Sequence, residues 1–535
     1  MTTGARRVAP SLVIAGLLAA VAAAAVPRGD PATAASDLDA IRAYIKRGWT
    51  ELRRSHRDLL AAAADPKLPP SSRRWPVYVA QDVAAIRERL VAEGIPDDEL
   101  ARLELRPLPA DRSTITEHGV LWLPEPYVVP GGRFNEMYGW DSYFILVGLL
   151  RDGEVELARG MVDNAIYEIE HYGTVLNANR TYYLTRSQPP FLTEMVLAVY
   201  ARTHDRAWLA RAVPAIEAYH RYWTTGPHLT ASGLSRYFDA GSGPAPEVLA
   251  GKRDAAGHTH YDRVKAFYRT HAVTDYDLTR FYDAGTDQLT ERFFVGDRSM
   301  RESGFDPSNR FGPFNAAVID MIPVCLNSLL YQLERDAATI AGILGNRAAV
   351  RTWEARAAAR KARIQALLWD EASGLYLDHD TTTKQRRRYP FLTTFWPLWV
   401  GIADADQARK VVANLGLFER PGGLQTSTFE SGSQWDAPYG WAPLELIAIK
   451  ALRRYGYASD ADRITVRFLS LILQVFRAQG AIVEKYDVVA RTAVTHAAFG
   501  YTTNEIGFGW TNAAFVELLA DLPAARRADI LRPPP

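Results

Sequence analysis

The sequence has only one cysteine, Cys325, among its 535 residues, so an intramolecular disulfide is excluded. Cys325 lies in the apolar stretch MIPVCLNSLL, and we expect it to be buried and unreactive. An excess of charge is also missing, since 62 lysines and arginines are balanced by 61 acidic residues. This balance disfavours a nucleic-acid partner, because binding to phosphates needs a concentrated basic surface.

Several motifs of cofactor and nucleophile chemistry are missing as well. The sequence contains no Gly-x-Gly-x-x-Gly, no phosphate-loop pattern and no Gly-x-Ser-x-Gly. It has no calcium-loop pattern of alternating acids. His258 and His260 form a pair without a third ligand at useful spacing, which is typical of a polar surface turn. The residues therefore predict no metal site.

Long apolar runs are confined to the N-terminus. Arg6 and Arg7 precede an apolar run over 11–26, followed by small residues that offer cleavage after Ala25 or Ala34. This order is typical of a secretory signal. A membrane anchor is the alternative, but the run is short and rich in alanine. We predict a signal peptide at 1–34 and, after its cleavage, a periplasmic or secreted protein without membrane attachment.

Helical periodicity dominates the rest of the chain, and strand patterns are short and scattered. Apolar residues recur with a period near 3.6 in nine segments, at 38–64, 83–93, 154–171, 193–203, 207–223, 313–344, 351–368, 444–454 and 460–478. We predict an all-α protein with short β elements in loops. Residues 35–125 would form an N-terminal helical segment packed on a main domain at 126–525.

Unusual polar and aromatic stretches stand just before helical runs. WDSY precedes FILVGLLRD, RSQPP precedes FLTEMVLAVY, SQWDAPYGWAP precedes LELIAIKALRR, and GFGWTN precedes AAFVELLAD. In antiparallel helix pairs these stretches would lie at the same end of the bundle. A closed ring of about six helix pairs fits the length and would bring them to one pocket.

Three of these stretches are rich in groups that hold sugars. They are PGGRFNEMYGWDSYF at 130–144, LNANRTYYLTRSQPP at 176–190 and GSQWDAPYGWAP at 432–443. Sugars bind flat aromatic faces, while carboxylates, amides and guanidinium groups bind their hydroxyls. Any single tryptophan or arginine is more often explained by core packing or a solvated ion pair. Three such stretches together favour a carbohydrate site.

Hydrolysis of a glycosidic bond needs one protonated and one ionised carboxyl group. Asp306 lies in RESGFDPSNRF among apolar neighbours, which would raise its pKa and retain a proton. Glu484 ends the apolar run of AIVEKYD, where a rigid base could be presented. The alternatives are that Asp306 caps a turn and that Glu484 pairs with Lys485 or with an arginine.

The sequence resembles the trehalase family. PGGRFNEMYGWDSYF is similar to its first signature and QWDAPYGWAP to its second, with NANRTYYLTRSQPP, RESGFDPSNRF and EKYD as further landmarks in the family's order. The resemblance covers about 130–512. RFFVGDRSMRESGFD and LNSLLYQLERD are closer to the intracellular, neutral type of the family than to the bacterial periplasmic type.

The resemblance implies an (α/α)6 toroid of the six-hairpin glycosidase type. It also implies hydrolysis of α,α-trehalose to two glucose molecules with inversion and without a cofactor, a step of trehalose catabolism. Independently of the resemblance, we expect a monomer. Asp306 would be the general acid and Glu484 the general base. The implied sugar-binding residues are Arg133, Phe134, Trp140, Asp141, Asn177, Arg186, Ser187, Gln188, Glu247, Gly304, Gln434 and Trp435.

Two departures from the family pattern leave alternatives open. Ala245 stands where the periplasmic type has an arginine before Pro-Glu, although the neutral type lacks it too. The loop after Glu484 is short and poor in glycine, and Glu505 is the candidate for the family's lid glutamate. The alternatives are a toroid glycosidase for another α-glucoside or a modified trehalose, and a sugar-binding protein without catalysis.

Overall fold

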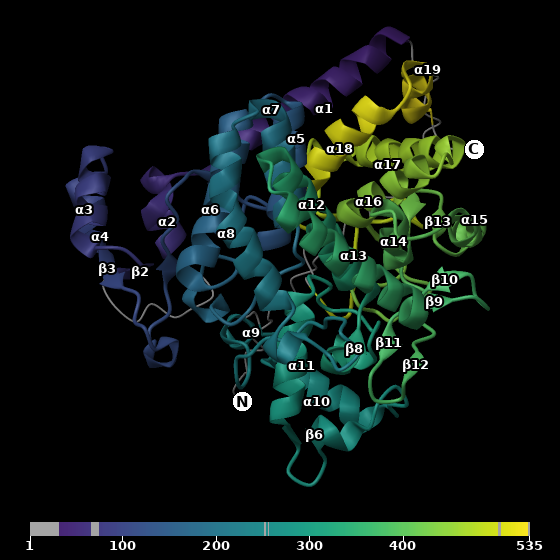
Figure 1. Ribbon diagram of the computed structural model, residues 1–535, viewed down its shortest axis with the longest axis horizontal. Helices are drawn as coiled ribbons and strands as arrows, with labels where there is room; N and C mark the ends of the chain where they lie inside the picture. Colours follow the sequence, from purple (N-terminus) through teal and green to yellow (C-terminus); the bar gives the residue numbers. More distant parts are fainter. Residues whose placement is uncertain (1–30, 66–73, 251–252, 255, 501–503, 533–535) are drawn as a thin grey trace, which may run out of the picture.

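The computed structural model describes residues 31–65, 74–250, 253–254, 256–500 and 504–532 (Figure 1). The expected signal peptide at 1–34 therefore lies almost entirely outside the described residues. Within the described part of the chain, none of the helices combines the length and apolar character needed to cross a membrane.

Twelve helices alternate along the chain between an outer and an inner layer (Figure 1). The inner helices are α5 (Gly139–Arg151), α7 (Leu192–Thr203), α12 (Val324–Leu344), α14 (Trp396–Trp399), α16 (Ala442–Arg454) and α18 (Gly509–Asp521). The outer helices are α1 (Pro31–Glu51), α6 (Val155–Tyr172), α8 (Arg206–Trp223), α13 (Arg347–Leu368), α15 (Ala405–Ala413) and α17 (Ala458–Gln479).

The inner helices form a closed ring. Each contacts the next, from α5 through α7, α12, α14 and α16 to α18, and α18 packs closely against α5. Nearly every residue of α5 and α18 is buried, which agrees with their apolar character on most sides. α1 closes the outer layer by packing against α17 and α18. The predicted all-α (α/α)6 toroid is confirmed.

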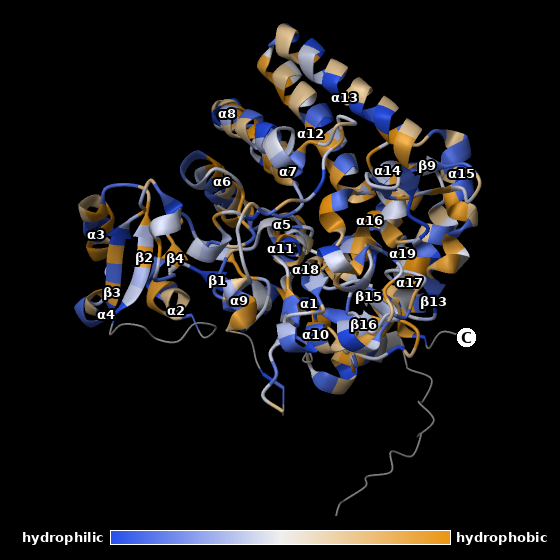
Figure 2. Ribbon diagram, turned by 90° about the horizontal axis from the view of Figure 1, so that it is seen from below, coloured by the Kyte–Doolittle hydropathy of each residue, from blue (hydrophilic) through white to orange (hydrophobic). Residues whose placement is uncertain are grey.

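A small β lobe lies between α1 and α5 in the chain and beside the toroid in space (Figure 2). Three parallel strands pair in the order β3-β2-β4, with bounds β2 (Trp75–Val79), β3 (Leu103–Pro107) and β4 (Val120–Leu121). Helices α3 (Val83–Ala92) and α4 (Asp97–Arg102) contact β3. The segment expected to be helical at 35–125 therefore also contains a sheet. β2 is buried along almost its whole length, as is typical of a strand in a parallel sheet.

The loops that lead into the inner helices contain the stretches singled out in the sequence. The chain between α8 and α12 is the longest of them and contains α9 (Pro246–Leu249), α10 (His260–Thr270) and α11 (Glu291–Glu302). Cys325 begins α12 and is buried and free of a disulfide, as expected. Because the inner helices are parallel members of one ring, their N-termini and the loops before them meet at the same end.

Candidate active site

The two sequence stretches nearest the N-terminus are joined by main-chain and side-chain hydrogen bonds. Tyr138 forms an antiparallel bridge with Ala178, and the amide of Gly139 donates to the carbonyl of Asn177 at 3.2 Å. The amide of Trp140, in the first turn of α5, donates to Oε1 of Gln188 at 2.9 Å. The side chain of Gln188 therefore orients the start of α5 instead of remaining free.

The third stretch is joined to the loop of Glu484. Strand β15 (Tyr439–Trp441) pairs antiparallel with β16 (Lys485–Asp487), in a register that places Trp441 opposite Lys485. The amide of Glu484 donates to the carbonyl of Glu505 at 2.9 Å. The backbone of Glu484 is therefore fixed from both sides, by β15 and by the loop before α18.

Aromatic rings from four different loops form one cluster. The indole of Trp435 stacks on Trp441 at 3.8 Å, and both lie about 6 Å from the ring of Trp510. Trp140 packs at 5.8 Å from Trp435 and at 5.4 Å from Phe305. These contacts bring the first signature, the second signature and the RESGFD loop together.

Gly304 fits directly against this cluster. Its φ of +77° is the left-handed conformation that favours glycine, and a Cβ there would lie 2.9 Å from the indole of Trp140. The position therefore needs glycine for both its backbone conformation and its close approach to the ring.

Two hydrogen bonds from the second signature fix the backbone at Asp306. The side-chain amide of Gln434 donates to the carbonyl of Asp306 at 2.5 Å, and the amide of Trp435 donates to the carbonyl of Pro307. The carboxyl group is about one quarter exposed and lies 3.6 Å from the guanidinium of Arg301. Burial raises the pKa of Asp306 to about 7, although the positive charges of Arg301 and Arg186 oppose the rise.

Glu484 is almost fully buried and pairs with its neighbour. Nζ of Lys485 lies 2.8 Å from Oε2 of Glu484, so the alternative of an ion pair with Lys485 is present in the structure. This lysine is itself buried and lies 5.1 Å from the ring of Trp441. Nε1 of Trp510 donates to the carbonyl of Glu484 at 3.2 Å.

Asp141 links the two acids electrostatically. Burial raises its pKa well above the usual range, and the negative charges of Glu484 and then Asp306 raise it further. A carboxyl group senses other carboxylates in this way only at short range. The structure therefore gathers Asp141, Asp306 and Glu484 at one place, although they come from three separate segments of the chain, Asp141 from the first turn of α5 and the other two from loops.

Arg186 occupies the centre of a second buried network. Its Nε lies 2.8 Å from Asp239 and its Nη1 lies 2.6 Å from Glu247. Burial would raise the pKa of Glu247, but the charges of Arg186 and Arg301 outweigh it and lower the pKa. Among the described residues, Nη2 of Arg186 and Oε2 of Glu247 have no hydrogen-bond partner. A ligand hydroxyl could satisfy both a donor and an acceptor here.

Asn177 and Ser187 lie in the wall of the same region. Nδ2 of Asn177 donates to the carbonyl of Arg301 at 3.4 Å. The hydroxyl of Ser187 donates to the carbonyl of Val175 at 2.5 Å, and its amide donates to Glu302. The Ser187 hydroxyl therefore donates its proton to the protein's own backbone.

Arg133 and Phe134 lie at the outer edge of the site. The guanidinium of Arg133 lies 4.6 Å above the ring of Phe134 and pairs with Glu505 at 3.0 Å. The amide of Arg133 also donates to the carboxylate of Glu505 at 3.1 Å. Glu505 therefore joins the first signature to the loop that follows Glu484.

Two residues of the site were missed in the sequence. Arg301 lies 3.6 Å from the carboxyl group of Asp306, and its place in the same stretch, RESGFD, was the available signal. Glu302 accepts from the amides of Ser187 and Phe238, so it holds two wall loops together. No group of three His, Cys, Asp or Glu residues suited to a metal ion occurs in the described ranges.

Comparisons with known proteins agree with this arrangement. A family model described as Trehalase matches residues 51–523. The cytosolic neutral trehalases of Pyricularia oryzae and Saccharomyces cerevisiae are 37% and 39% identical over 73% of the chain. The chain spans 58% and 56% of the length of these two relatives. The structure of neutral trehalase Nth1 from Saccharomyces cerevisiae superposes with a TM-score of 0.78 at 32% identity, covering 93% of this chain and 96% of that one.

These comparisons correct one expectation. Both curated relatives are named cytosolic, which contradicts the predicted signal peptide and the predicted periplasmic or secreted location. The prediction of a signal peptide rested on composition alone, a basic pair followed by an alanine-rich run. Such a pattern does not establish the cellular compartment.

Proposed function

The chain belongs to the trehalase family, and on that premise we propose that it is an inverting α,α-trehalase that hydrolyses trehalose to two glucose molecules. The relatives named cytosolic neutral trehalases support this activity and a cytosolic location. The observation that carries the proposal is that the second signature joins the segments of both acids. Gln434 and Trp435 donate to the carbonyls of Asp306 and Pro307, and Trp441 pairs in register with Lys485, next to Glu484.

Asp306 is the proposed general acid. A pKa of about 7 keeps a large fraction of the carboxyl groups protonated near neutral pH. The proton would pass to the oxygen that bridges the two glucose rings as the bond to the leaving glucose breaks. Arg301, 3.6 Å away, would then stabilise the aspartate that forms.

Glu484 is the proposed general base. Nζ of Lys485, 2.8 Å from Oε2 of Glu484, would hold this carboxylate in position to accept a proton from water. Water activated by Glu484 would attack the anomeric carbon on the face opposite the leaving oxygen, which inverts its configuration. Burial of Glu484 strengthens its interaction with charge that develops on the sugar.

The remaining predicted positions form the proposed sugar site. Trp140, Trp435 and Phe134 would provide apolar faces, and the unpartnered atoms of Arg186 and Glu247 would bind hydroxyls. The other proposed sugar-binding residues are Arg133, Asp141, Asn177, Ser187, Gln188, Gly304 and Gln434. The proposed domain division places the catalytic toroid at 126–525, to which the structure adds α1 as an outer helix.

A second candidate is hydrolysis of a modified trehalose or another α-glucoside. It is favoured by the ion pair between Arg133 and Glu505, which joins the short loop after Glu484 to the rim of the site. A larger or differently substituted second ring would meet this pair first.

The test is glucose release from trehalose and from a panel of α-linked glucose disaccharides. Wild-type protein is expected to prefer trehalose, while Asp306→Asn and Glu484→Gln lose at least about 100-fold in kcat and retain their thermal unfolding transition. Asp98→Asn and Glu88→Gln, at exposed positions of the small lobe, are the matched controls. Near-normal turnover by either active-site variant would overturn the assignment of roles.

A further inference from the structure

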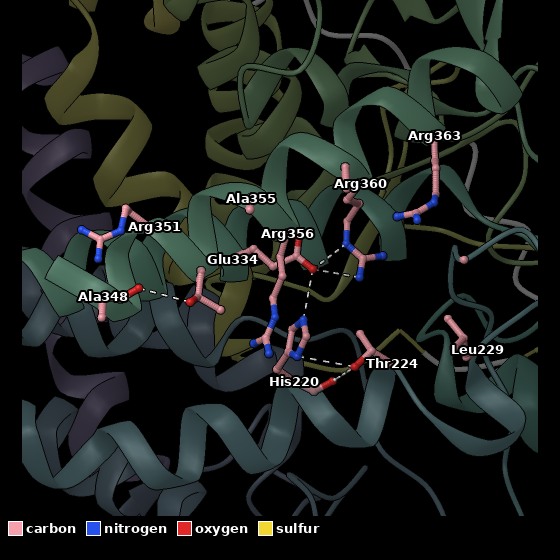
Figure 3. Close-up of a pocket in the computed structure, with 13 residues that line it drawn as sticks. His220, Thr224, Leu229, Glu334, Ala348, Arg351, Ala355, Arg356, Arg360 and Arg363 are labelled. Atoms are coloured by element: carbon pink, nitrogen blue, oxygen red, sulfur yellow. Dashed lines mark hydrogen bonds and ion pairs between the residues drawn. The ribbon is translucent and has the colours of Figure 1, made fainter. Parts of the chain in front are cut away.

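A groove on the toroid is lined by residues of α8, α12 and α13, and none of its lining residues belongs to the proposed active site (Figure 3). Its volume is about 840 Å³, which is within the usual range for sites that bind small molecules. α8 contributes His220, Thr224 follows the last residue of α8, and α12 contributes Glu334. The groove plays no part in the proposed hydrolysis.

Two neighbouring rows of α13 line one side of this groove. One row is Arg351, Ala355, Ala359 and Arg363, and the other is Ala348, Thr352, Arg356 and Arg360, each with the four-residue spacing of a helix face. The alanines leave open space between the arginines. Figure 3 shows Arg351, Arg360 and Arg363 spread along the helix, with the side chain of Arg356 extending toward His220.

Three of these arginines are available to a ligand. Arg351, Arg356 and Arg363 are exposed, and in the described part of the chain no acidic side chain forms an ion pair with them. An arginine presents a planar fork of donors that matches the oxygens of phosphate. Successive arginines on one side of a groove therefore favour an anionic group there.

The floor of the groove offers a hydrogen-bond acceptor, a carboxylate oxygen of Glu334. Oε1 of Glu334 accepts from Arg360 at 2.9 Å and lies 3.0 Å from Nε2 of His220. Its other oxygen, Oε2, has no hydrogen-bond partner among the described residues, although the side chain is only 2% exposed. An orphaned carboxylate oxygen calls for a donor, such as a hydroxyl group.

We propose that this groove binds a small phosphorylated polyol, with the phosphate held by arginines of α13 and hydroxyl groups directed to Glu334. Inorganic phosphate alone would satisfy the arginines and leave the acceptor on the floor without a partner. A neutral sugar would donate a hydroxyl group to Glu334 and leave the arginines without an anion. Only a ligand with both groups matches both parts of the groove.

The test measures binding to the full-length protein by calorimetry, with glucose 6-phosphate, inorganic phosphate and glucose as probes. Glucose 6-phosphate is expected to bind at least about 10-fold more tightly than either other probe, and its affinity is expected to fall as salt rises. Equal binding of inorganic phosphate would overturn the polyol part of the proposal. The absence of binding by all three probes would overturn it completely.

Variants separate the groove from general charge effects. Arg356→Ala with Arg363→Ala is expected to weaken glucose 6-phosphate binding at least about 10-fold, and Ala355→Trp is expected to do the same by filling the groove without changing its charge. Arg347→Ala is the control, because Arg347 is exposed on the same helix but does not line the groove. Trehalose turnover is expected to be unchanged in all three. An equal loss of binding in the Arg347→Ala variant, or full binding by the other two, would contradict the proposal.

Discussion

The guanidinium of Arg301, at the end of α11, lies 3.6 Å from the carboxyl group of Asp306. Two opposing effects therefore act on one acid. Burial raises the pKa of Asp306 to about 7, and the positive charge of Arg301 limits that rise. The pair gives the proposed general acid a pKa near neutrality and a partner for its ionised form.

The pH dependence of turnover should report this pair. The general acid must be protonated, so kcat/KM for trehalose should fall on the alkaline side with an apparent pKa near 7. Arg301→Gln removes the charge that lowers the pKa, so the alkaline limb should move to higher pH as overall activity falls. Arg347→Gln is the control for loss of a distant arginine. An alkaline limb at the same pH in Arg301→Gln as in wild type would contradict the electrostatic role of Arg301.

The same raised pKa has a consequence for stability. The pKa of Asp306 is about 7 in the folded protein and 3.8 in the unfolded chain, so between these values the folded state binds more protons. The free energy of unfolding therefore falls as pH rises from about 4 to 7. Asp306→Asn removes this loss, and at about pH 8 it should be more stable than wild type by on the order of 1–3 kcal/mol.

Thermal unfolding at about pH 4 and about pH 8 checks this prediction. The two proteins should unfold at similar temperatures at the lower pH and differ at the higher one. Asp98→Asn, at an exposed site, should show no such divergence. A variant that is less stable than wild type at the higher pH would contradict a raised pKa of Asp306 in the folded protein.

Gly304 tests the packing of the aromatic wall. Gly304→Ala places a methyl group 2.9 Å from the indole of Trp140 in a left-handed backbone, and we expect a loss of about 2–4 kcal/mol in the free energy of unfolding. Gly153→Ala shares the positive φ but has open space around its Cβ, and should lose only about 1–2 kcal/mol. Denaturant unfolding measures both. Equal losses would show that contact with Trp140 is unimportant.

Arg186 tests the proposed binding of hydroxyl groups. The guanidinium group of Arg186 contacts Asp239 and Glu247 with two of its nitrogens and leaves the third for a ligand. Lysine keeps the positive charge but lacks this forked group, so Arg186→Lys should raise KM for trehalose at least about 10-fold. Arg211→Lys, exposed on α8, is the control. Steady-state kinetics with a parallel unfolding measurement separate the two effects. An unchanged KM in a folded variant would remove Arg186 from the sugar site.

The ring itself was predictable from the order of segments. Polar and aromatic stretches before helical runs recur along the chain, and a closed ring of inner helices brings their N-termini together. The sheet of the small lobe was not predictable in the same way. WPVYV at 75–79 is only five residues long, too short to distinguish a period of two from one of 3.6.

The site was predictable where the residue type alone indicated its chemistry. Asp306, Glu484 and the tryptophans stand in distinctive stretches, and the structure brings their loops together. The pairing of Arg301 with Asp306 depends on how the turn after α11 folds back, and spacing along the chain does not encode that distance. The hydroxyl of Ser187 likewise donates to the carbonyl of Val175, and this contact depends on tertiary packing, which the sequence pattern does not encode.

The most direct test of the account follows the anomers of glucose released from trehalose by proton NMR in the first minutes, before mutarotation. Attack by water on the face opposite the leaving oxygen predicts one β-glucose and one α-glucose from each trehalose. Release of α-glucose alone would show retention, and it would contradict the proposal that Asp306 and Glu484 act as the acid and the base of a single inverting displacement.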